Sequence, residues 1–360
     1  MALAVHQEVV RRDVRLRPGR TATNRLLLLA AAAAAVLAVA ALAGARYGLL
    51  LLIGLGFGAV LEGLRFGFAG PWRLLIRDRD ARGLLAQLLA IGLTATVAIP
   101  LLGAHPGELA GAHAPIGIAM LLGAFVFGAG MQVVLGCGSG TLVNAGSGNA
   151  IGLLALPMFV VGSFLATLHL DDWAALGSLP VLTMPGLFGT SGAVLATLAL
   201  LVAVALVAVA LAPRERRLPP RRLVVAAVLL AVLALANLVV AGQPWGVVYG
   251  LGLWGAKLAS GLGMDLSGAA FWQAAGNAER LRASLLTDVT SLTNLGLILG
   301  ALIAARWSGG AMAPQVGPLP ARAWIAVVLA GLALGYSSRI AFGCNVGAFF
   351  SGIATGSLHG

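Results

Sequence analysis

The sequence predicts an all-α polytopic membrane protein with about ten transmembrane helices in two internal repeats. Of its 360 residues, 60% are hydrophobic and only 10% are charged, and the mean hydropathy is +0.98. A soluble core cannot bury so much apolar surface. The Lys and Arg residues cluster in short segments between apolar runs, which is the pattern of cytoplasmic loops in membrane proteins. In addition, one glycine-cysteine segment occurs twice.

The apolar runs set the number of spans, because about 20 apolar residues cross a bilayer. Residues 1–25 form a polar, basic arm. The run that follows is long for a signal peptide and is expected to be an uncleaved first helix, with cleavage after Ala43 as the alternative. The predicted spans are 26–43, 47–61, 83–103, 116–135, 150–168, 189–212, 222–241, 245–258, 283–305 and 322–341.

The basic residues predict which connectors face the cytoplasm. The segments expected inside are the amino terminus, 62–82, 213–222 and the stretch around Lys257, Arg280 and Arg282. The connectors without Lys or Arg, which are expected outside, are 104–115, 169–188 and 242–245, whereas 306–321 is ambiguous. The protein is therefore expected in the bacterial inner (cytoplasmic) membrane, with its amino terminus in the cytoplasm.

An internal repeat relates the only two cysteines of the chain. Cys137 and Cys344 lie 207 positions apart. Glycines recur at the same spacing around them: Gly128, Gly136 and Gly140 match Gly335, Gly343 and Gly347. The first membrane repeat is expected to cover 26–213 and the second 221–360. The even number of predicted helices between the halves implies that they cross in the same direction, related by an axis along the membrane normal.

Each cysteine closes an apolar run and opens a stretch rich in Gly, Ser and Asn. Backbone N–H and C=O groups that lie outside a helix cannot face lipid without hydrogen-bond partners. We therefore expect the chain to form re-entrant breaks inside the protein, near the membrane midplane. A thiol suits a soft sulfur or selenium atom, and adjacent glycine amides suit an anion. The alternative is that the cysteines are small buried hydrophobes and that the glycines serve helix packing.

The candidate substrate-binding residues therefore lie around the two cysteines. They are Cys137, Cys344, Gly136, Gly138, Gly343, Asn345 and Arg339. Arg339 can attract an anion, or it can be a helix-end arginine that extends to the interface. Gln132, Asp288 and Asn294 are candidates for lining a pathway. The last two belong to a polar stripe along 284–294, which can equally hold helices together.

Enzyme and cofactor motifs do not occur in the sequence. It contains neither HExxH nor a phosphate-binding GxxxxGK[ST], and its two cysteines have no metal-ligand spacing. We therefore expect no catalysis, no cofactor and no metal. The net charge is +11, but aromatic residues are not interleaved with the basic ones. We therefore expect membrane lipid as a partner and do not expect nucleic acid.

Three segments resemble the YeeE/YedE family of membrane proteins. They are GFGAVLEGLRFGFAGPWRLL at 56–75, FGAGMQVVLGCGSGTLVNAGSGN at 127–149 and GYSSRIAFGCNVGAFFSGIATGSLHG at 335–360. The resemblance implies an hourglass-shaped protein that takes up a sulfur compound, thiosulfate in one branch. It also implies that the ion passes between thiols through transient S–H···S contacts. Another branch of the family is associated with selenium.

The chain departs from that family in three ways. Gly67 stands where the family usually has a further thiol, and it remains a candidate pathway residue. The order of the halves resembles a permuted form of the selenium-linked members. The chain ends at Gly360, 16 residues beyond Cys344. A closing helix equivalent to 150–168 is therefore expected to be missing, or to be supplied by a partner.

These observations predict a permease that moves a small sulfur-containing anion, thiosulfate by the family resemblance, past Cys137 and Cys344. Three alternatives remain open. The first is a membrane thiol carrier that hands sulfane sulfur or selenium to a cytoplasmic sulfurtransferase. The second is a selenium-compound transporter, and the third is a structural subunit with inert cysteines.

Overall fold

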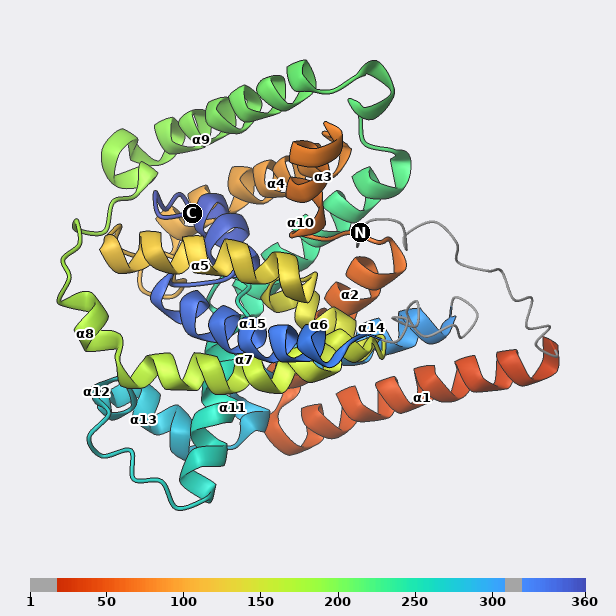
Figure 1. The fold of residues 1–360 in the computed structure, drawn as a ribbon, viewed down its shortest axis with the longest axis vertical. Coiled ribbons are helices and arrows are strands. Elements are labelled where there is room, and N and C mark those ends of the chain that lie inside the picture. The colour runs from red at the N-terminus through yellow and green to blue at the C-terminus, as the bar shows by residue number, and fades with distance from the viewer. Residues whose placement is uncertain (1–17, 308–318) are drawn as a thin grey trace.

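Helices make up the regular structure of the described part of the chain. The computed structural model describes residues 18–307 and 319–360, and within those ranges it contains only isolated β-bridges and no strand. Residues 1–17 of the predicted basic arm lie outside the described residues, as does most of connector 306–321. Residues 18–25 already belong to the first helix (Figure 1).

Nine of the ten predicted spans contain one long helix, the tenth, 245–258, contains the shorter α11, and further short helices lie between the long ones. The α-helices are α1 (Pro18–Ala43), α2 (Ala45–Gly63), α3 (Gly70–Asp78), α4 (Arg82–Ala104), α5 (Ile118–Val134), α6 (Gly138–Gly146), α7 (Ala150–Leu168), α8 (Leu170–Ala174), α9 (Met184–Leu211), α10 (Arg221–Ala241), α11 (Val248–Gly261), α12 (Ala270–Gln273), α13 (Ala275–Arg282), α14 (Val289–Trp307), α15 (Ala321–Ile340) and α16 (Ser351–Ala354). Two 3-10 helices, η1 (Arg214–Arg216) and η2 (Leu285–Thr287), and one π-helix, η3 (Asn345–Phe350), complete the set.

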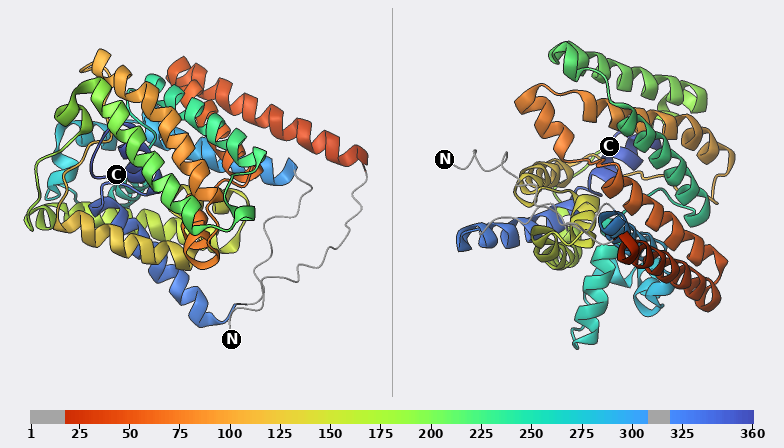
Figure 2. Two further views of the ribbon diagram at one scale, coloured as in Figure 1. Left: turned by 90° about the horizontal axis from the view of Figure 1, so that it is seen from above. Right: turned by 90° about the vertical axis from the view of Figure 1, so that its right-hand side faces the viewer.

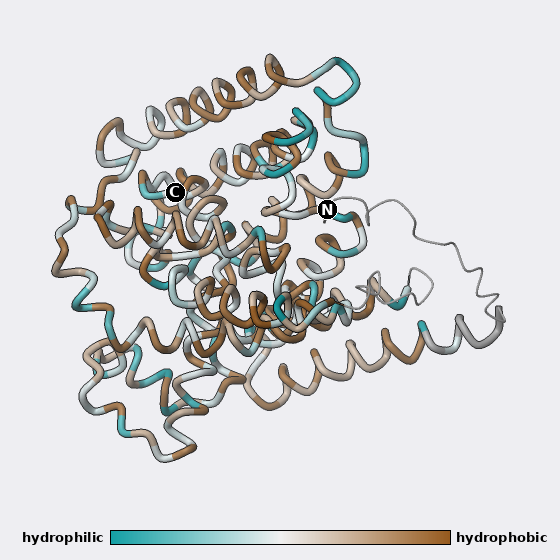
Figure 3. Tube along the Cα trace, in the orientation of Figure 1, coloured by the Kyte–Doolittle hydropathy of each residue, from teal (hydrophilic) through white to brown (hydrophobic). Residues whose placement is uncertain are grey.

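Nine stretches of the described residues are long and apolar enough to cross a membrane. In an 18-residue apolar stretch of each helix, the share that is buried inside the protein is 6% for α1 and 17% for α9. The corresponding share is 56% for α2 and 61% for α4. Figures 1 and 2 show α1 and α9 on the outside of the bundle, and Figure 3 shows that both are largely hydrophobic. Helices with this exposed apolar surface belong in lipid. The prediction of an all-α polytopic membrane protein is therefore confirmed.

Glycines bring α2 and α14 into backbone contact along much of their length. A Cβ added to Gly54 would lie 2.9 Å from the Cα of Gly296, and one added to Gly58 would overlap the Leu297 carbonyl oxygen. The later residue on α2 contacts the later residues on α14, so the two helices run parallel. Small residues allow such close approach in membranes, where helices associate through packing.

The predicted span 245–258 does not cross the bundle. Its helix, α11, has 14 residues, or about 21 Å of rise, which is too short for a hydrocarbon core of about 30 Å. Figures 1 and 2 show α11 lying across the long helices. Leu251 and Leu253 of α11 are fully buried, and a Cβ at Gly255 would lie 2.6 Å from the Cβ of Phe164 on α7, so this part of α11 packs on protein.

This placement corrects the topology expected for Lys257, Arg280 and Arg282. The segment after α11 lies at the carboxyl end of α7, where Trp272 Nε1 donates a hydrogen bond to Thr167 Oγ1 at 2.8 Å. That end of the bundle is opposite the Arg-rich turn between α9 and α10 (Figure 1). The charge rule failed here because it assumes that every apolar run crosses the membrane.

The two helices that precede the cysteines run in opposite directions. A Cβ at Gly123 of α5 would lie 2.7 Å from the Ile340 side chain of α15, and one at Gly130 would lie 3.0 Å from Leu334. The expected axis along the membrane normal is therefore wrong, because α11 does not cross and the chain enters α15 from the other end. An axis in the membrane plane, as in inverted-repeat transporters, fits these directions. The division into repeats at 26–213 and 221–360 stays a prediction.

Candidate functional site

Both cysteines follow the same kind of backbone turn. Leu135 and Phe342, each two residues before a cysteine, have φ values of 59° and 57°. This left-handed conformation costs a non-glycine residue about 1 to 3 kcal/mol. Cys137 and Cys344 are extended, with φ values of −84° and −98°, and each begins the next helix, α6 or η3. At each cysteine the chain thus ends a long helix, turns and starts a short one.

The two turns bring the cysteines together at one buried point. A Cβ added to Gly138 would lie 2.9 Å from Cys344 Sγ and 3.2 Å from Cys344 Cβ. Because Gly138 is bonded to Cys137, the two cysteines are neighbours across the fold. They are 1% and 2% exposed, and neither forms a disulfide. A side chain at position 138 would therefore push into the space of the second thiol.

Hydrogen-bond donors surround the two thiols. Cys137 Sγ lies 3.4 Å from Ser139 Oγ. The Cys344 thiol is within reach of backbone N–H groups from both segments, those of Gly138, Ser139, Val346 and Gly347. N–H groups that converge at helix starts form a concave site that favours negative charge. The site thus combines two soft sulfur atoms with several donors.

Aromatic rings belong to the same buried cluster as the cysteines. Phe57 and Trp245 stack with 3.8 Å between ring centroids, and Phe68 and Phe350 pack edge-on against Trp245. The rings exclude water, which strengthens electrostatic interactions at the thiols. The indole N–H of Trp245 has no partner among the described residues, and an unpaired buried donor costs about 1 to 3 kcal/mol.

A cavity of about 220 Å³ borders Cys137. Its lining includes the pair Glu62 and Arg65, whose charged atoms are 3.1 Å apart. Arg65 also lines a second cavity with Arg82 and Arg222. The space beside Cys137 therefore lies next to the end of the bundle that carries the Arg-rich segments. Gly67, Gly136, Ser139 and Asn144 also line this cavity.

Gly67 borders this cavity together with Cys137. Its carbonyl accepts a hydrogen bond from Gln87 Nε2 at 2.8 Å, and the carbonyl of Phe68 accepts one from Asn345 Nδ2 at 3.4 Å. No described atom lies within 4 Å of a Cβ placed at Gly67. The backbone is thus held in place, while a side chain at position 67 would have room.

Gly67→Cys is expected to fold normally and to add one thiol that reacts from the cavity. The native cysteines are buried, so they should react more slowly, by about tenfold or more. Mass spectrometry after brief treatment of membranes with a small, polar thiol reagent would count the labels. Gly128→Cys is the matched control, since its Cβ also meets no described atom within 4 Å but position 128 does not line the cavity. Equal labelling at positions 67 and 128 would contradict the expectation.

Arg339 does not line this cavity. Its guanidinium lies over Phe271 and Tyr249, at 4.9 and 5.5 Å from their ring centroids. Its Nε and Nη2 atoms are closed to solvent and have no hydrogen-bond partner among the described residues. Arg339 as a whole is only partly buried, and its Nη1 is not among these closed atoms, so the alternative of an arginine that extends to the interface stays a prediction.

The other predicted pathway residues make local contacts. Gln132 accepts from Arg73 Nε at 2.8 Å, the Ser291 N–H donates to Asp288 at 2.7 Å, and Asn294 donates to the Val247 carbonyl at 2.9 Å. None of the three lines the cavity beside Cys137, whereas Gly67 does. The polar stripe is also not continuous on one helix, because η2 ends at Thr287 and α14 begins at Val289.

Three residues of the site are missing from the sequence prediction. Gln87 is the only amide side chain in the run 83–103, and a polar residue inside a span is a usable signal. Ser139 has a weaker signal, its place within Gly-Cys-Gly-Ser-Gly. Trp245 has none, because it lies in a short connector that only the fold brings to the cysteines.

Comparison with known proteins identifies the family of this chain. A family model described as Sulphur transport matches residues 62–360. A protein described as the probable transporter YedE of Escherichia coli (strain K12) is 28% identical over 120 residues, which are 33% of this chain and 28% of that protein. The match therefore spans well under half of that relative. The resemblance to the YeeE/YedE family is confirmed, and the chain belongs to the sulphur transport family of multi-pass membrane proteins.

Proposed function

We propose that the protein is an inner-membrane permease that carries thiosulfate, a small sulfur-containing anion, between the thiols of Cys137 and Cys344. One observation carries this proposal. Two free, buried thiols from distant segments meet beside a cavity. The family match supports transport of a sulfur compound, and the choice of ion and the route past the thiols are our inference.

The groups around the thiols complement both ends of a thiosulfate ion. Its terminal sulfur is soft and polarizable, so it can accept weak S–H···S contacts from each cysteine. Its oxygens can accept hydrogen bonds from the Ser139 hydroxyl and from the N–H groups near Cys344. Gly136, Gly138 and Gly343 keep side chains out of the way of these amides. Each contact is weak, so the ion can leave as readily as it enters.

In this proposal the cavity beside Cys137 faces the cytoplasm, and the amino terminus lies on the same side. The basic segments 62–82 and 213–222 share that end of the bundle (Figure 1), which agrees with the retention of Lys and Arg inside the cell. Lipid would contact the exposed helices α1 and α9.

Uptake of radiolabelled thiosulfate by cysteine variants tests the proposal. Cys137→Ala and Cys344→Ala are each expected to lower the initial rate about tenfold or more, because the ion loses a soft partner worth about 1.4 kcal/mol in the transition state. Cys137→Ser and Cys344→Ser are matched controls that keep the size and a donor but not the soft sulfur. Full uptake by a folded protein with both cysteines replaced would rule the proposal out.

A thiol carrier is the second candidate. Cys137 borders a cavity next to a basic surface that includes Arg65 and Arg222, where a cytoplasmic sulfurtransferase can approach. In that function, sulfane sulfur or selenium would stay bound to the cysteine between steps. A persulfide (Cys–S–S⁻) or a selenosulfide (Cys–S–Se⁻) on Cys137, detected by mass spectrometry and absent from Cys137→Ala, would favour the carrier. Rapid uptake of intact labelled thiosulfate without such an adduct would favour the permease.

A further inference from the structure

Two arginines contact the same aromatic ring at the end of the bundle away from the Cys137 cavity. Arg280 and Arg339 both lie on the ring of Tyr249, at 5.0 and 5.5 Å from its centroid. Within the described ranges, neither arginine forms an ion pair with an Asp or Glu. An aromatic ring attracts each cation, but the two cations repel each other. This pairing would be stabilised by an anion.

The position of Arg339 is energetically unfavourable without a ligand. Two of its nitrogen atoms, Nε and Nη2, are closed to solvent and unpartnered among the described residues. Gly252 makes room for the guanidinium, because a Cβ there would lie against Nη2. The nearby hydroxyl of Ser163 is used elsewhere, since it donates to the Val248 carbonyl at 3.3 Å. Buried charged donors without acceptors are destabilising, and in membrane proteins they mark sites of function.

The other charged groups nearby do not neutralise this pair. Asp288 accepts the Ser291 N–H at 2.7 Å through Oδ2, its Oδ1 is buried without a hydrogen-bond partner among the described residues, and it forms no ion pair with either arginine there. Lys257 is held by the carbonyls of Leu281 and Ala283. Glu279, on α13 beside Arg280, is exposed and has no ion pair with it among the described residues. Arg280, Arg339 and Lys257 outnumber the one buried carboxylate, so the cluster carries a net positive charge.

Hydrogen bonds hold the aromatic part of this cluster in place. The Tyr249 hydroxyl donates to Asn277 Oδ1 at 2.9 Å, and Asn277 Nδ2 donates to the Phe271 carbonyl at 2.9 Å. The two rings that carry Arg339 are thus linked through one amide side chain. A site whose supports are fixed in advance binds its ligand with less loss of conformational entropy.

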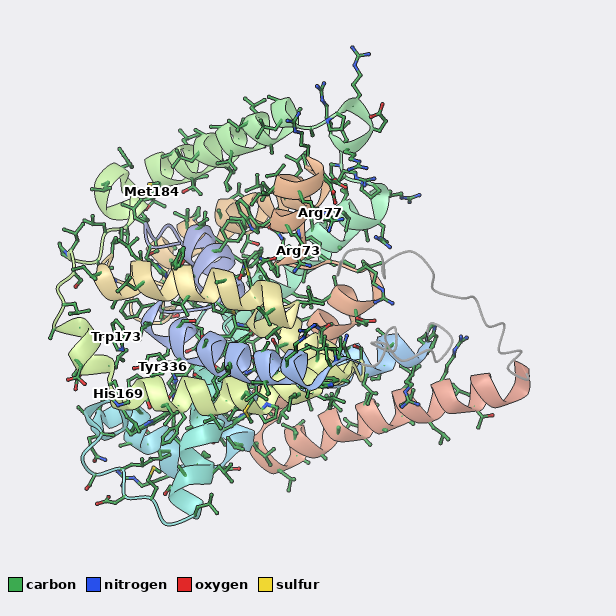
Figure 4. All side chains as sticks on the ribbon, in the orientation of Figure 1. Arg73, Arg77, His169, Trp173, Met184 and Tyr336 are labelled. Atoms are coloured by element: carbon green, nitrogen blue, oxygen red, sulfur yellow. The ribbon has the colours of Figure 1, made fainter. Side chains whose placement is uncertain are left out.

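The opposite end of the bundle has a counterpart with one positive charge fewer. Arg73 and Gln132 lie 207 positions before Arg280 and Arg339, which is the spacing of the two cysteines. There Arg73 Nε donates to Gln132 Oε1 at 2.8 Å, so the single cation has an acceptor. Figure 4 shows Arg73 at one end of the bundle and Tyr336, one turn before Arg339, at the other. The two ends therefore differ by one positive charge at matched positions.

We propose that Arg280, Arg339 and Tyr249 form a binding site for a small divalent oxyanion. The site lies close to the thiols, because Val247, two residues before Tyr249, would be 3.5 Å from a Cβ on Gly138. An anion held there reaches Cys344 from the side opposite the cavity. That loading order rests on the proposed function, whereas the anion site does not.

Anion-dependent thermal stabilisation of the purified full-length protein tests the site. Sulfate and thiosulfate are titrated against sodium chloride of equal ionic strength, and the apparent Kd is taken from the rise in Tm. Arg339→Gln and Arg280→Gln are each expected to raise the Kd about tenfold or more, because each removes a charged donor. Arg339→Lys should retain part of the affinity, since it keeps the charge without the planar fork.

Two arginine variants serve as matched controls. Arg282→Gln removes the same charge from an exposed position on α13, and Arg73→Gln removes it from the other end. Both are expected to bind sulfate as the wild type does. An unchanged Kd in folded Arg339→Gln and Arg280→Gln, or an equal loss in Arg282→Gln, would overturn the proposal. Arg280→Gln decides the result if Arg339→Gln does not fold.

The double variant Cys137→Ala/Cys344→Ala separates this site from the proposed function. It is expected to bind sulfate with the wild-type Kd, because neither thiol contacts the two arginines. If thiosulfate uptake survives in this variant while Arg339→Gln still loses sulfate binding, the thiol route fails and the anion site stands. If the double variant loses sulfate binding in a folded state, the site at Arg280 and Arg339 is contradicted.

Discussion

Gly58→Val is expected to prevent the accumulation of folded protein. A Cβ at position 58 of α2 would overlap the Leu297 carbonyl oxygen and lie 2.6 Å from the Ala301 nitrogen. Both are backbone atoms of α14, so no change of side-chain rotamer can relieve the overlap. The two helices would have to separate.

Separation would disrupt the whole contact between α2 and α14. Gly54, Gly296 and Gly300 bring the same two backbones together at further points. Extra methylene groups in a packed core typically cost about 1 to 3 kcal/mol. A backbone overlap that opens several contacts at once should cost more, and the net stability of a typical protein is only about 5 to 15 kcal/mol.

The yield of monodisperse protein in detergent, measured by gel filtration after equal expression, would check this expectation. Gly128→Val is the matched control, because a Cβ at Gly128 meets no described atom within 4 Å. It should accumulate as the wild type does. A normal elution profile for Gly58→Val would contradict the close packing of α2 on α14.

Gly138→Ala is expected to abolish most thiosulfate uptake while both cysteines remain. The added Cβ would lie 2.9 Å from Cys344 Sγ and 3.2 Å from Cys344 Cβ, so it would occupy the space where the ion meets the second thiol. The closest clash is with the end of a short side chain, which can move, and the contact with Cys344 Cβ needs only a small shift, so the fold should persist. Displacing a soft contact by even one methyl group should reduce the rate at least about tenfold.

Initial uptake rates, normalised to the amount of folded protein in the membrane, would check this prediction. Gly140→Ala lies on the same short helix, but its Cβ would meet only Cys137 Sγ, at 3.9 Å, an ordinary van der Waals distance. It should keep most of the wild-type rate. If Gly138→Ala transports thiosulfate normally, the ion does not pass between these two thiols.

Local patterns in the sequence predicted much of this fold. Nine of the ten predicted spans contain a long helix, because burial in lipid imposes a continuous apolar run. The turns before Cys137 and Cys344 coincide with glycine-rich stretches, because bare backbone cannot face lipid. The single Gln87 in an apolar run could also have been identified as a site residue.

Other features depended on contacts between distant segments. The run 245–258 looks like a span because its residues are apolar, yet α11 lies across the bundle and packs on α7. That one placement reversed the direction of α15 relative to α5 and moved Arg280 to the opposite end. Likewise, only the folded chain brings Trp245 to the cysteine cluster and Arg339 onto Tyr249. A sequence records that a residue is apolar or charged, whereas tertiary packing decides whether lipid or protein surrounds it and which charges become neighbours.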